Sequence, residues 1–384
     1  MNELDELRQK IDAIDKQLLP LFLERMEICS QVADYKRKVG MEVLDAGRER
    51  RILENKMQLV EGEREKNEVY EFYHAIMSIS RARQAGELEE NSRKQKVKEI
   101  FQPVAPVESP TVVFQGSPGA YSEEAAVSFF GEETNRFCVK TFADAFEALK
   151  TEQADYAVLP IENSYSGTIV ENMDLLEKYS YFIVGEINIP IRHYLMGLPG
   201  TNLSDIQKVY SHEQGIIQSS RFLKSMPDVT CEAYYNTAMS AKLVAESGDK
   251  HLAAVAGKRN AKLYGLSILA ENIQDSDKNT TRFVVVAKKP QCDTACDKVS
   301  CVFTLRHESG ELHRVLAMFA HGGLNLIKLE SRPIHHRNFE YMFFVDYTGN
   351  LLDSHVAEIT DNVIVGTQAF KLLGNYKSCE DKGE

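Results

Sequence analysis

Apolar residues recur at alternating steps of three and four along the first part of the chain, which is the spacing of one apolar stripe on a long helix. The residues in this stripe are Leu4, Leu7, Ile11, Ile14, Leu18 and Leu21. Pro20 lies inside the stripe and predicts a kink, because proline removes one backbone hydrogen bond of a helix. The pattern then continues to about Lys38, and Gly40 predicts the end of this helix.

Two more helical patterns follow, over residues 45–60 and 67–84, so we predict an all-helical domain over residues 1–90. Three helices with one apolar seam each bury little surface alone, which favours an intertwined homodimer or a homotetramer. Residues 91–110 are strongly charged at first and contain three prolines between positions 103 and 110. This composition predicts an extended linker.

Between residues 111 and 290, short apolar runs alternate with helical patterns. The expected strands cover residues 111–114, 157–159, 182–186, 194–197, 208–211, 253–256 and 282–287. The expected helices begin near Ser122 and cover residues 213–225 and 237–247. Such alternation predicts an α/β fold with a mostly parallel sheet and helices on both of its faces.

A polar loop follows the expected strand at residues 157–159. Pro160 ends this strand, because proline lacks the N–H that a sheet requires. The polar residues that come next are Glu162, Asn163, Ser164, Ser166 and Thr168. α/β proteins place ligands in loops at the ends of strands, so this loop is a candidate site. An ordinary strand–turn–helix junction, with Asn163 or Ser164 as the helix cap, fits the spacing equally well.

Residues 298–376 have the order strand, helix, strand, strand, helix, strand. The expected strands cover residues 299–305, 325–330, 339–347 and 369–373, and the expected helices cover 311–320 and 354–362. This order is typical of the ferredoxin-like α+β fold. The fold alone implies no function.

The composition is that of a soluble multidomain protein, with 43% hydrophobic and 27% charged residues among 384. The net charge of −12 argues against a nucleic-acid partner, since phosphate binding requires a basic surface. No apolar run approaches the roughly 20 residues of a membrane span, so no membrane contact is expected. The acidic N-terminus lacks the apolar core of a secretory signal, and seven scattered cysteines favour reduced thiols. We therefore expect a cytoplasmic protein.

No metal and no organic cofactor are expected. Cys292 and Cys296 have no second ligand pair nearby, and His335 and His336 would point to opposite faces of a strand. The chain also lacks the glycine-rich fingerprints of dinucleotide and triphosphate sites.

Charged residues on the expected N-terminal helices fall into sets that share a face. Arg25 and Lys36 lie about three helical turns apart on one face, whereas Arg8 is rotated away by roughly 100°. Two further pairs lie one turn apart and each faces one side, namely Asp45 with Glu49 and Ser80 with Gln84. For any single pair, a solvated helix face with surface salt bridges is the simpler interpretation.

Taken together, these positions resemble the all-helical class of chorismate mutases over nearly all of residues 1–90. The resemblance implies a pocket that binds the carboxylates, ether oxygen and ring hydroxyl of chorismate. The implied substrate-binding residues are Arg8 (from a second protomer), Arg25, Lys36, Asp45, Glu49, Ser80 and Gln84, with Arg25, Lys36 and Gln84 catalytic. A pericyclic rearrangement requires no base or nucleophile. It requires a compact conformer and donors placed where negative charge grows, each worth ~3 kcal/mol.

Four motifs further along the chain resemble those of prephenate dehydratases. They are Gly116–Ser122, Pro160–Gly167, Tyr210–Gln214 with Gln218, and Asn279–Phe283. The resemblance implies two lobes around a cleft, as in type II periplasmic binding proteins, over residues 111–290. It implies Thr281 as the catalytic residue, whose hydroxyl donates to the departing ring hydroxyl.

The same resemblance implies a set of substrate-binding residues, which are Ser122, Glu162, Asn163, Ser164, Ser211, His212, Gln218, Arg282 and Phe283. Arg282 could orient a substrate carboxylate through two parallel hydrogen bonds. His212 could equally be a structural histidine at a helix start. Glu213 stands where the family motif has proline. Arogenate dehydratases share these motifs, so the sequence leaves prephenate and arogenate open as substrates.

Residues 298–376 resemble an ACT domain, a regulatory module. The residues implied in binding a phenylalanine effector are Gly310, Glu311, Leu312, Glu330, Ser331, Arg332 and Pro333. Inhibition requires that the effector binds one state of the protein better than the other.

The function that these resemblances imply is conversion of chorismate to prephenate and of prephenate to phenylpyruvate, with feedback inhibition by phenylalanine. One alternative is a two-lobed amino-acid sensor without catalysis, and another is an arogenate dehydratase. A mutase–dehydrogenase of the tyrosine branch is disfavoured because the dinucleotide fingerprint is missing.

Overall fold

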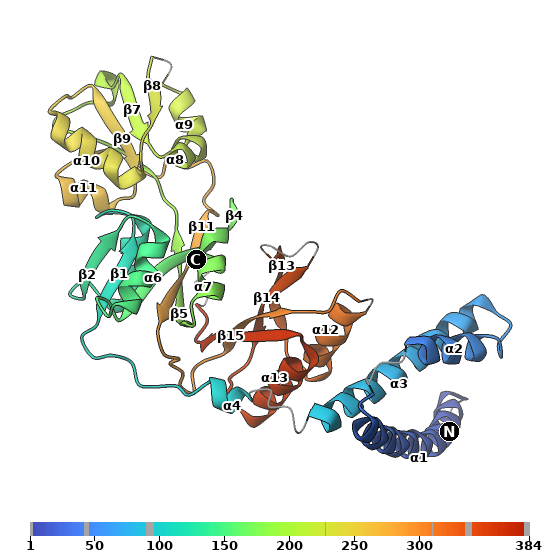
Figure 1. Cartoon of the computed structure of the whole chain (residues 1–384). Coiled ribbons are helices and arrows are strands. Elements are labelled where there is room, and N and C mark those ends of the chain that lie inside the picture. Colours follow the sequence, from blue (N-terminus) through green and yellow to red (C-terminus); the bar gives the residue numbers. More distant parts are fainter. Residues whose placement is uncertain are drawn as a thin grey trace. The chain divides into compact units, whose positions relative to one another are not determined.

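The computed structural model describes residues 3–41, 46–89, 96–226, 228–308, 310–334 and 340–379. The chain divides into two compact units. The smaller unit comprises Met1–Glu99, Thr304–Gly323 and Glu358–Ala369, and the larger unit comprises Ile100–Phe303, Leu324–Ala357 and Phe370–Glu384. Figure 1 follows the chain from its N-terminus to its C-terminus, and each unit is described by itself.

The N-terminal part of the smaller unit is helical, as predicted. It contains α1 (Glu3–Val39), α2 (Ala46–Met57) and α3 (Glu63–Glu89), and α3 packs against both of the others. Helix α1 continues through Pro20, as expected from the apolar pattern that persists beyond it. The same unit contains α12 (Glu311–His321) and most of α13 (Ser354–Gly366).

The apolar stripe of α1 is largely exposed within the described part of the smaller unit. Its six residues Leu4, Leu7, Ile11, Ile14, Leu18 and Leu21 are 44–63% exposed. In α1 only Met26 and Ala33 are buried. A stripe of this length on one helix face is typical of a surface that packs against another polypeptide.

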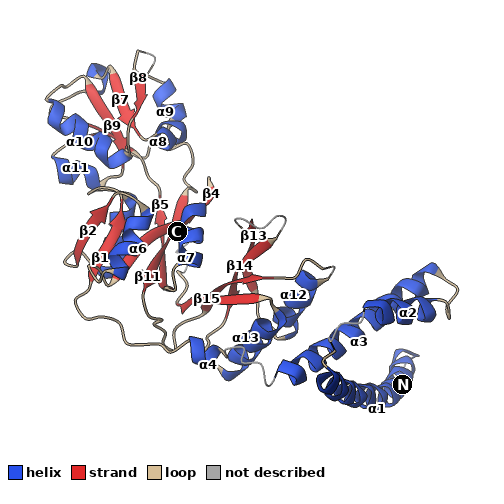
Figure 2. Ribbon diagram, in the orientation of Figure 1, coloured by secondary structure: helices blue, strands red, loops and turns tan. Residues whose placement is uncertain are grey.

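Helix α4 (Val97–Ile100) ends at Ile100, the first residue of the larger unit, and this unit contains most of a ten-stranded sheet. The strands of the sheet's first half are β1 (Thr111–Gln115), β2 (Asn135–Val139), β3 (Tyr156–Asn163), β4 (Gly167–Thr168), β5 (Phe182–Pro190) and β11 (Thr280–Ala287). The helices α5 (Tyr121–Phe130), α6 (Phe142–Lys150) and α7 (Val170–Lys178) connect them, and together they form the first lobe. Figure 2 shows α6 and α7 beside the strands.

The prediction of a mostly parallel sheet is wrong for the centre of this lobe. Strand β1 pairs in parallel with β2 and β3, but β11 is antiparallel to both β3 and β5. The chain leaves the first lobe at the end of β5 and returns through β11, so these two neighbours run in opposite directions. This return places the end of β3 beside the start of β11.

The second lobe has its own five-stranded sheet, with the order β10-β6-β9-β7-β8. Its strands are β6 (Tyr194–Gly197), β7 (Lys208–Ser211), β8 (Thr230–Ala233), β9 (Leu252–Ala256) and β10 (Ser267–Ala270). Its helices are η1 (Leu203–Asp205), α8 (Glu213–Gln218), α9 (Ser220–Lys224), α10 (Thr237–Ser247) and α11 (Arg259–Tyr264). The single helix expected over 213–225 is therefore two short helices that meet at Ser219.

The remaining strands are β12 (Lys298–Thr304), β13 (Leu326–Pro333), β14 (Tyr341–Thr348) and β15 (Ala369–Tyr376). They follow the expected chain order with α12 and α13, and they lie in the order β13-β14-β12-β15 in the sheet. Phe339, where one of these strands was expected to begin, lies outside the described residues, as do His335 and His336. The first residues of the expected linker also lie outside them.

The C-terminal strands continue the sheet of the first lobe. Strand β15 meets β5 at one parallel pair, Gly374 opposite Ile183. A Cβ atom on residue 374 would lie 2.1 Å from the carbonyl oxygen of Ile183, so this contact requires glycine. One apolar cluster also contains both Leu159 and Val284 of the first lobe and residues of the C-terminal strands, such as Phe344. The two regions therefore share a core.

Two negative observations apply to the described part of the chain. It contains no helix long and apolar enough to cross a bilayer. It also contains no group of three or more histidine, cysteine or acidic residues that could hold a metal ion. All seven cysteines are free thiols.

Candidate active sites

A cavity of about 300 Å³ lies between the two lobes of the larger unit, and both lobes line it. Six residues expected from the sequence are in its wall, namely Ser122, Asn163, His212, Gln218, Thr281 and Phe283. These residues come from four separate segments of the chain. The fold therefore brings the four motifs to one place.

Two of the longer helices begin at this cavity. Ser122 lies in the first turn of α5, and Thr237 is the first residue of α10. The N–H groups of a first helical turn lack intrahelical partners and carry partial positive charge. The cavity is consequently suited to a ligand with carboxylate groups.

Thr281 and Asn163 form a hydrogen-bonded pair in the cavity wall. They lie opposite each other in the β11–β3 ladder, and Asn163 Nδ2 donates to Thr281 Oγ1 at 2.9 Å. The other end of the Asn163 amide accepts from the backbone N–H groups of Tyr165 and Ser166 at 3.0 and 2.9 Å. These contacts fix the amide. Because the Thr281 oxygen accepts from Asn163, its own hydrogen remains available to a ligand.

A second hydrogen-bonded group joins the two lobes at His193. Its Nε2 lies 2.9 Å from Gln218 Oε1, and its Nδ1 lies 3.2 Å from the hydroxyl of Tyr121. Burial lowers the pKa of His193, and the hydrogen bond to Gln218 opposes this effect. Burial also raises the pKa of Tyr121, and the nearby charge of Glu124 adds to that rise. Both rings are therefore neutral near pH 7.

Polar residues also meet between α1 and α3 of the smaller unit. Arg25 donates to the hydroxyl of Ser80, which is buried. Gln84, one turn further along α3, is buried too, and its Oε1 has no hydrogen-bond partner. Glu49 of α2 is paired with Arg81 of α3. A buried acceptor without a partner is rare and points to a site that a ligand completes.

Comparisons with known proteins cover both regions. The sequence matches the family model of chorismate mutase type II over residues 7–85 and that of prephenate dehydratase over residues 112–291. A relative from Aquifex aeolicus, named bifunctional chorismate mutase/prephenate dehydratase, is 32% identical over 98% of this chain and 98% of its own. The chain belongs to the bifunctional chorismate mutase/prephenate dehydratase family.

Two solved structures each cover 70% of this chain. A prephenate dehydratase from Arthrobacter aurescens in complex with L-Phe has a TM-score of 0.64 and 30% identity, with 90% of that chain covered. A protein described as a novel type of quorum quenching acylase has a TM-score of 0.65 and 28% identity, with 98% of that chain covered. A shared fold does not fix the reaction, so the residues of the dehydratase cavity decide its chemistry.

In the mutase region, the structure brings together some of the expected residues. Arg25 contacts Ser80, and Gln84 is buried on the same helix as Ser80. Lys36 is half-buried on α1. Arg8 is largely exposed, with Asp5 3.9 Å away, and Asp45 lies outside the described residues. The Arg81 partner of Glu49 was not expected from the sequence.

In the dehydratase region, four expected residues lie away from the cavity. Glu162 and Arg282 point to the opposite face of the sheet, because neighbouring residues on a strand alternate between faces. The Arg282 guanidinium is already paired with the carboxylates of Glu186 and Asp346 at 2.9 and 2.8 Å. The expectation that Arg282 orients a substrate carboxylate is therefore not supported.

The other two are serines with backbone partners. Ser211 is fully buried and donates to the carbonyl of Val255 at 2.8 Å. Ser164 donates to the carbonyl of Lys278 at 2.9 Å. Ser211 therefore links β7 to β9, and Ser164 links the turn after β3 to the segment before β11. His212 caps α8 by accepting from the N–H of Gln214, as the structural alternative expected, and it also lines the cavity.

Several cavity residues were missed by the sequence interpretation, chiefly Tyr121, His193, Asn236 and Thr237. Asn236 caps α10 and also lies 3.2 Å from the hydroxyl of Ser117 in the first lobe. The motif Asn236-Thr237 before a helical pattern is a capping signal that could have been found. His193 lies between β5 and β6 and carries no such signal.

The expected effector residues are divided between the two units. In the smaller unit, Gly310 precedes α12 with a φ of 85°, and Glu311 accepts from Arg314 at 2.7 Å. Leu312 follows in the first turn of that helix. In the larger unit, Glu330, Ser331, Arg332 and Pro333 form the end of β13. Arg332 lies 3.6 Å from Glu330 and 3.8 Å from Asp174 of α7.

Proposed function

We propose that the N-terminal helices rearrange chorismate to prephenate and that the two-lobed cavity converts prephenate to phenylpyruvate, in the synthesis of phenylalanine. The observation that carries the second step is the Thr281–Asn163 pair in a cavity where helices begin. Membership of the family, over nearly the full chain, supports both steps.

For the dehydratase step, the first turns of α5 and α10 bind the carboxylates of prephenate, assisted by the hydroxyls of Ser122 and Thr237. Carbon dioxide leaves, its bonding electrons enter the ring, and the ring hydroxyl departs as water with the uptake of one proton. Thr281 donates a hydrogen bond to the departing oxygen. Asn163 holds the threonine hydroxyl in the orientation that this donation requires.

For the mutase step, Arg25 and Lys36 bind the carboxylates, and Gln84 lies near the breaking bond. Oriented donors lower the barrier because negative charge develops on the ether oxygen. The unpartnered acceptor of Gln84 supports a role toward a ligand group that can donate, such as the ring hydroxyl. Arg8 reaches the pocket of a second protomer in this proposal, and the exposed stripe of α1 is the contact surface between protomers.

For regulation, strands β12 to β15 with α12 and α13 form an ACT-like ferredoxin arrangement that binds phenylalanine. The order of the elements along the chain and of the strands in the sheet supports this arrangement. The solved relative in complex with L-Phe supports the choice of effector. The effector residues would be those expected from the sequence, at the start of α12 and the end of β13.

The protein acts in the cytoplasm in this proposal, where seven free thiols stay reduced. Neither step uses a metal or an organic cofactor.

The test is turnover by the purified full chain. Chorismate should yield phenylpyruvate, and phenylalanine should suppress its formation. Thr281→Ala should keep mutase activity and lose phenylpyruvate formation, whereas Arg25→Ala should lose mutase activity and keep turnover of added prephenate. Prephenate and arogenate are compared as substrates in the same assay. Equal loss of both activities in either variant would contradict two separate sites, and no turnover of either substrate would leave the amino-acid sensor.

A further inference from the structure

The two strands that carry the catalytic pair also carry a charged pair on their other face. Thr281 is opposite Asn163, and Arg282 is opposite Glu162 in the neighbouring pair of the antiparallel ladder. Because side chains alternate across a strand, the first pair faces the dehydratase cavity and the second faces the C-terminal strands. A displacement of the backbone at the second pair therefore also displaces the first.

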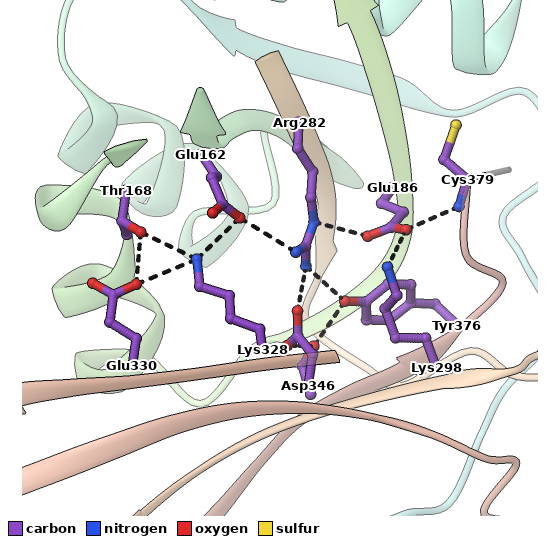
Figure 3. Close-up of polar contacts among 11 residues, drawn as sticks. Glu162, Thr168, Glu186, Arg282, Lys298, Lys328, Glu330, Asp346, Tyr376 and Cys379 are labelled. Atoms are coloured by element: carbon purple, nitrogen blue, oxygen red, sulfur yellow. Dashed lines mark hydrogen bonds and ion pairs between the residues drawn. The ribbon is translucent and has the colours of Figure 1, made fainter. Parts of the chain in front are cut away.

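Arg282 holds a fixed position among the C-terminal strands. Its guanidinium is 16% exposed and contacts Glu186 at 2.9 Å, Asp346 at 2.8 Å and the hydroxyl of Tyr376 at 3.2 Å. Burial alone would lower its pKa, but the charges of Tyr376, Asp346 and Glu186 raise it well above the usual range. Figure 3 shows the guanidinium between these groups. Each carboxylate has a second donor, namely Lys298 for Glu186 and Ser300 for Asp346.

Lys328 of β13 makes a second and different connection. Its Nζ lies 3.0 Å from Glu162, 3.1 Å from Thr168 and 3.3 Å from Glu330. Thr168 in turn donates to Glu330 at 2.6 Å. Figure 3 shows the ammonium group between the three oxygens. A lysine ammonium is a compact charge on a flexible stem, so it can shift between two carboxylates without losing its pairing.

We propose that Lys328 is the residue through which the C-terminal sheet controls the dehydratase cavity, with Arg282 as the fixed positioning residue beside it. When β13 moves, Lys328 shifts between Glu330 and Glu162, and the strand segment Glu162–Asn163 follows. Asn163 then no longer holds the hydroxyl of Thr281 in its productive orientation. This inference rests on the proposed function, because it takes an amino-acid effector of the C-terminal sheet, phenylalanine, as the ligand that moves β13.

A purely structural role for Lys328 predicts different results for its replacement. If it only held the fold together, its replacement would lower stability and activity with or without effector. If it couples the two regions, its replacement leaves uninhibited turnover nearly unchanged and weakens inhibition. Spatial proximity alone cannot distinguish the two, so the effector response has to be measured.

The experiment compares Lys328→Met, Lys328→Arg and Lys208→Met in the full chain. Lys208→Met is the matched control, because Lys208 also bridges two strands, with Glu232 at 3.1 Å, but it lies in the second lobe. Phenylpyruvate formation from prephenate is measured against phenylalanine concentration, and phenylalanine binding is measured separately by equilibrium dialysis. Mutase activity and the melting temperature report on folding.

The proposal expects Lys328→Met to bind phenylalanine and to require at least about fivefold more of it for half-inhibition, the lower end of typical coupling between sites. Its uninhibited kcat/KM should stay within about threefold of the parent. Lys328→Arg should retain inhibition, and Lys208→Met should behave as the parent. If the parent is inhibited and Lys328→Met is inhibited equally, or if Lys208→Met loses inhibition as well, the role of Lys328 is refuted while the proposed function stands. If the parent makes phenylpyruvate but neither binds nor responds to phenylalanine, the proposed regulation is refuted and this inference with it.

Discussion

Replacing Arg282 with methionine should destabilise the larger unit by about 3 kcal/mol, because removing one partner from a buried ion pair typically costs about 3–5 kcal/mol. The structure favours the lower end of that range. Glu186 retains Lys298, and Asp346 retains the hydroxyl of Ser300, so neither carboxylate is left wholly unpaired. For a unit of this size, 1 kcal/mol corresponds to roughly 2–4 °C, so its melting temperature should fall by roughly 6–12 °C.

The assay is differential scanning calorimetry of the full chain, in which the transition of the larger unit is assigned by loss of dehydratase activity on heating. Arg136→Met serves as the control. The Arg136 side chain is 18% exposed, close to the 16% of Arg282, and it is paired with Glu123 at 3.0 Å. Its other carboxylate partner, Glu132, is largely exposed, and Glu123 also has Arg259 nearby.

Arg136→Met should therefore cost less, about 1 kcal/mol, because Glu123 keeps Arg259 nearby and the pair with the exposed Glu132 contributes little. A melting temperature for Arg282→Met within 2 °C of the parent would refute the reasoning. So would an equal loss in Arg136→Met, because the loss of a partner by two buried carboxylates, Glu186 and Asp346, would then not be the deciding factor.

Two further predictions concern pH and assembly. The pKa of His193 is lowered in the folded protein from about 6.5, so the unfolded chain binds the proton more readily than the folded one as the pH falls. The contribution of neutral His193 to the free energy of unfolding is therefore complete above about pH 6.5 and is lost as the pH falls below it. His193→Gln should remove part of this acid-side fall in melting temperature, and an unchanged pH profile would contradict a buried neutral imidazole. Ile14→Asp, in the middle of the exposed stripe of α1, should convert the assembly toward single protomers in sedimentation experiments. It should also lower mutase activity at least tenfold while turnover of prephenate persists. An unchanged assembly would rule out this stripe as the contact surface between protomers.

The sequence singled out Thr281 and Asn163 because both lie in motifs that resemble those of prephenate dehydratases, and the structure places both in the cavity wall. Asn163 ends one strongly apolar strand and Thr281 lies near the start of another, and polar residues at the ends of strands are candidate ligand contacts in α/β proteins. The same motifs misplaced Glu162 and Arg282, although the alternation of side chains along a strand was sufficient to assign them to the opposite face. A sequence motif includes consecutive residues of a strand, but only every second one of them lies on the face that contacts the ligand.

Other features depended on contacts between distant segments. The antiparallel course of β11 follows from the return of the chain out of the second lobe, which no local pattern records. His193 reaches the cavity from the short connection between β5 and β6, and the hydrogen-bond partners of its ring lie far away in the sequence, at Tyr121 and Gln218. The break between α8 and α9 also escaped the helical pattern, because only Ser219 separates the two helices and neither glycine nor proline marks the break.

The shared core under the joined sheet has a practical consequence for strain engineering. Cutting the chain before β12 would strip Val302, Phe344 and Leu373 from an apolar cluster that also holds Leu159 and Val284, and would leave the β5 edge uncovered. Newly exposed apolar surface next to an unpaired strand edge promotes aggregation. A variant that is no longer inhibited by phenylalanine is therefore better sought by single substitutions along β13 than by truncation of the C-terminal strands.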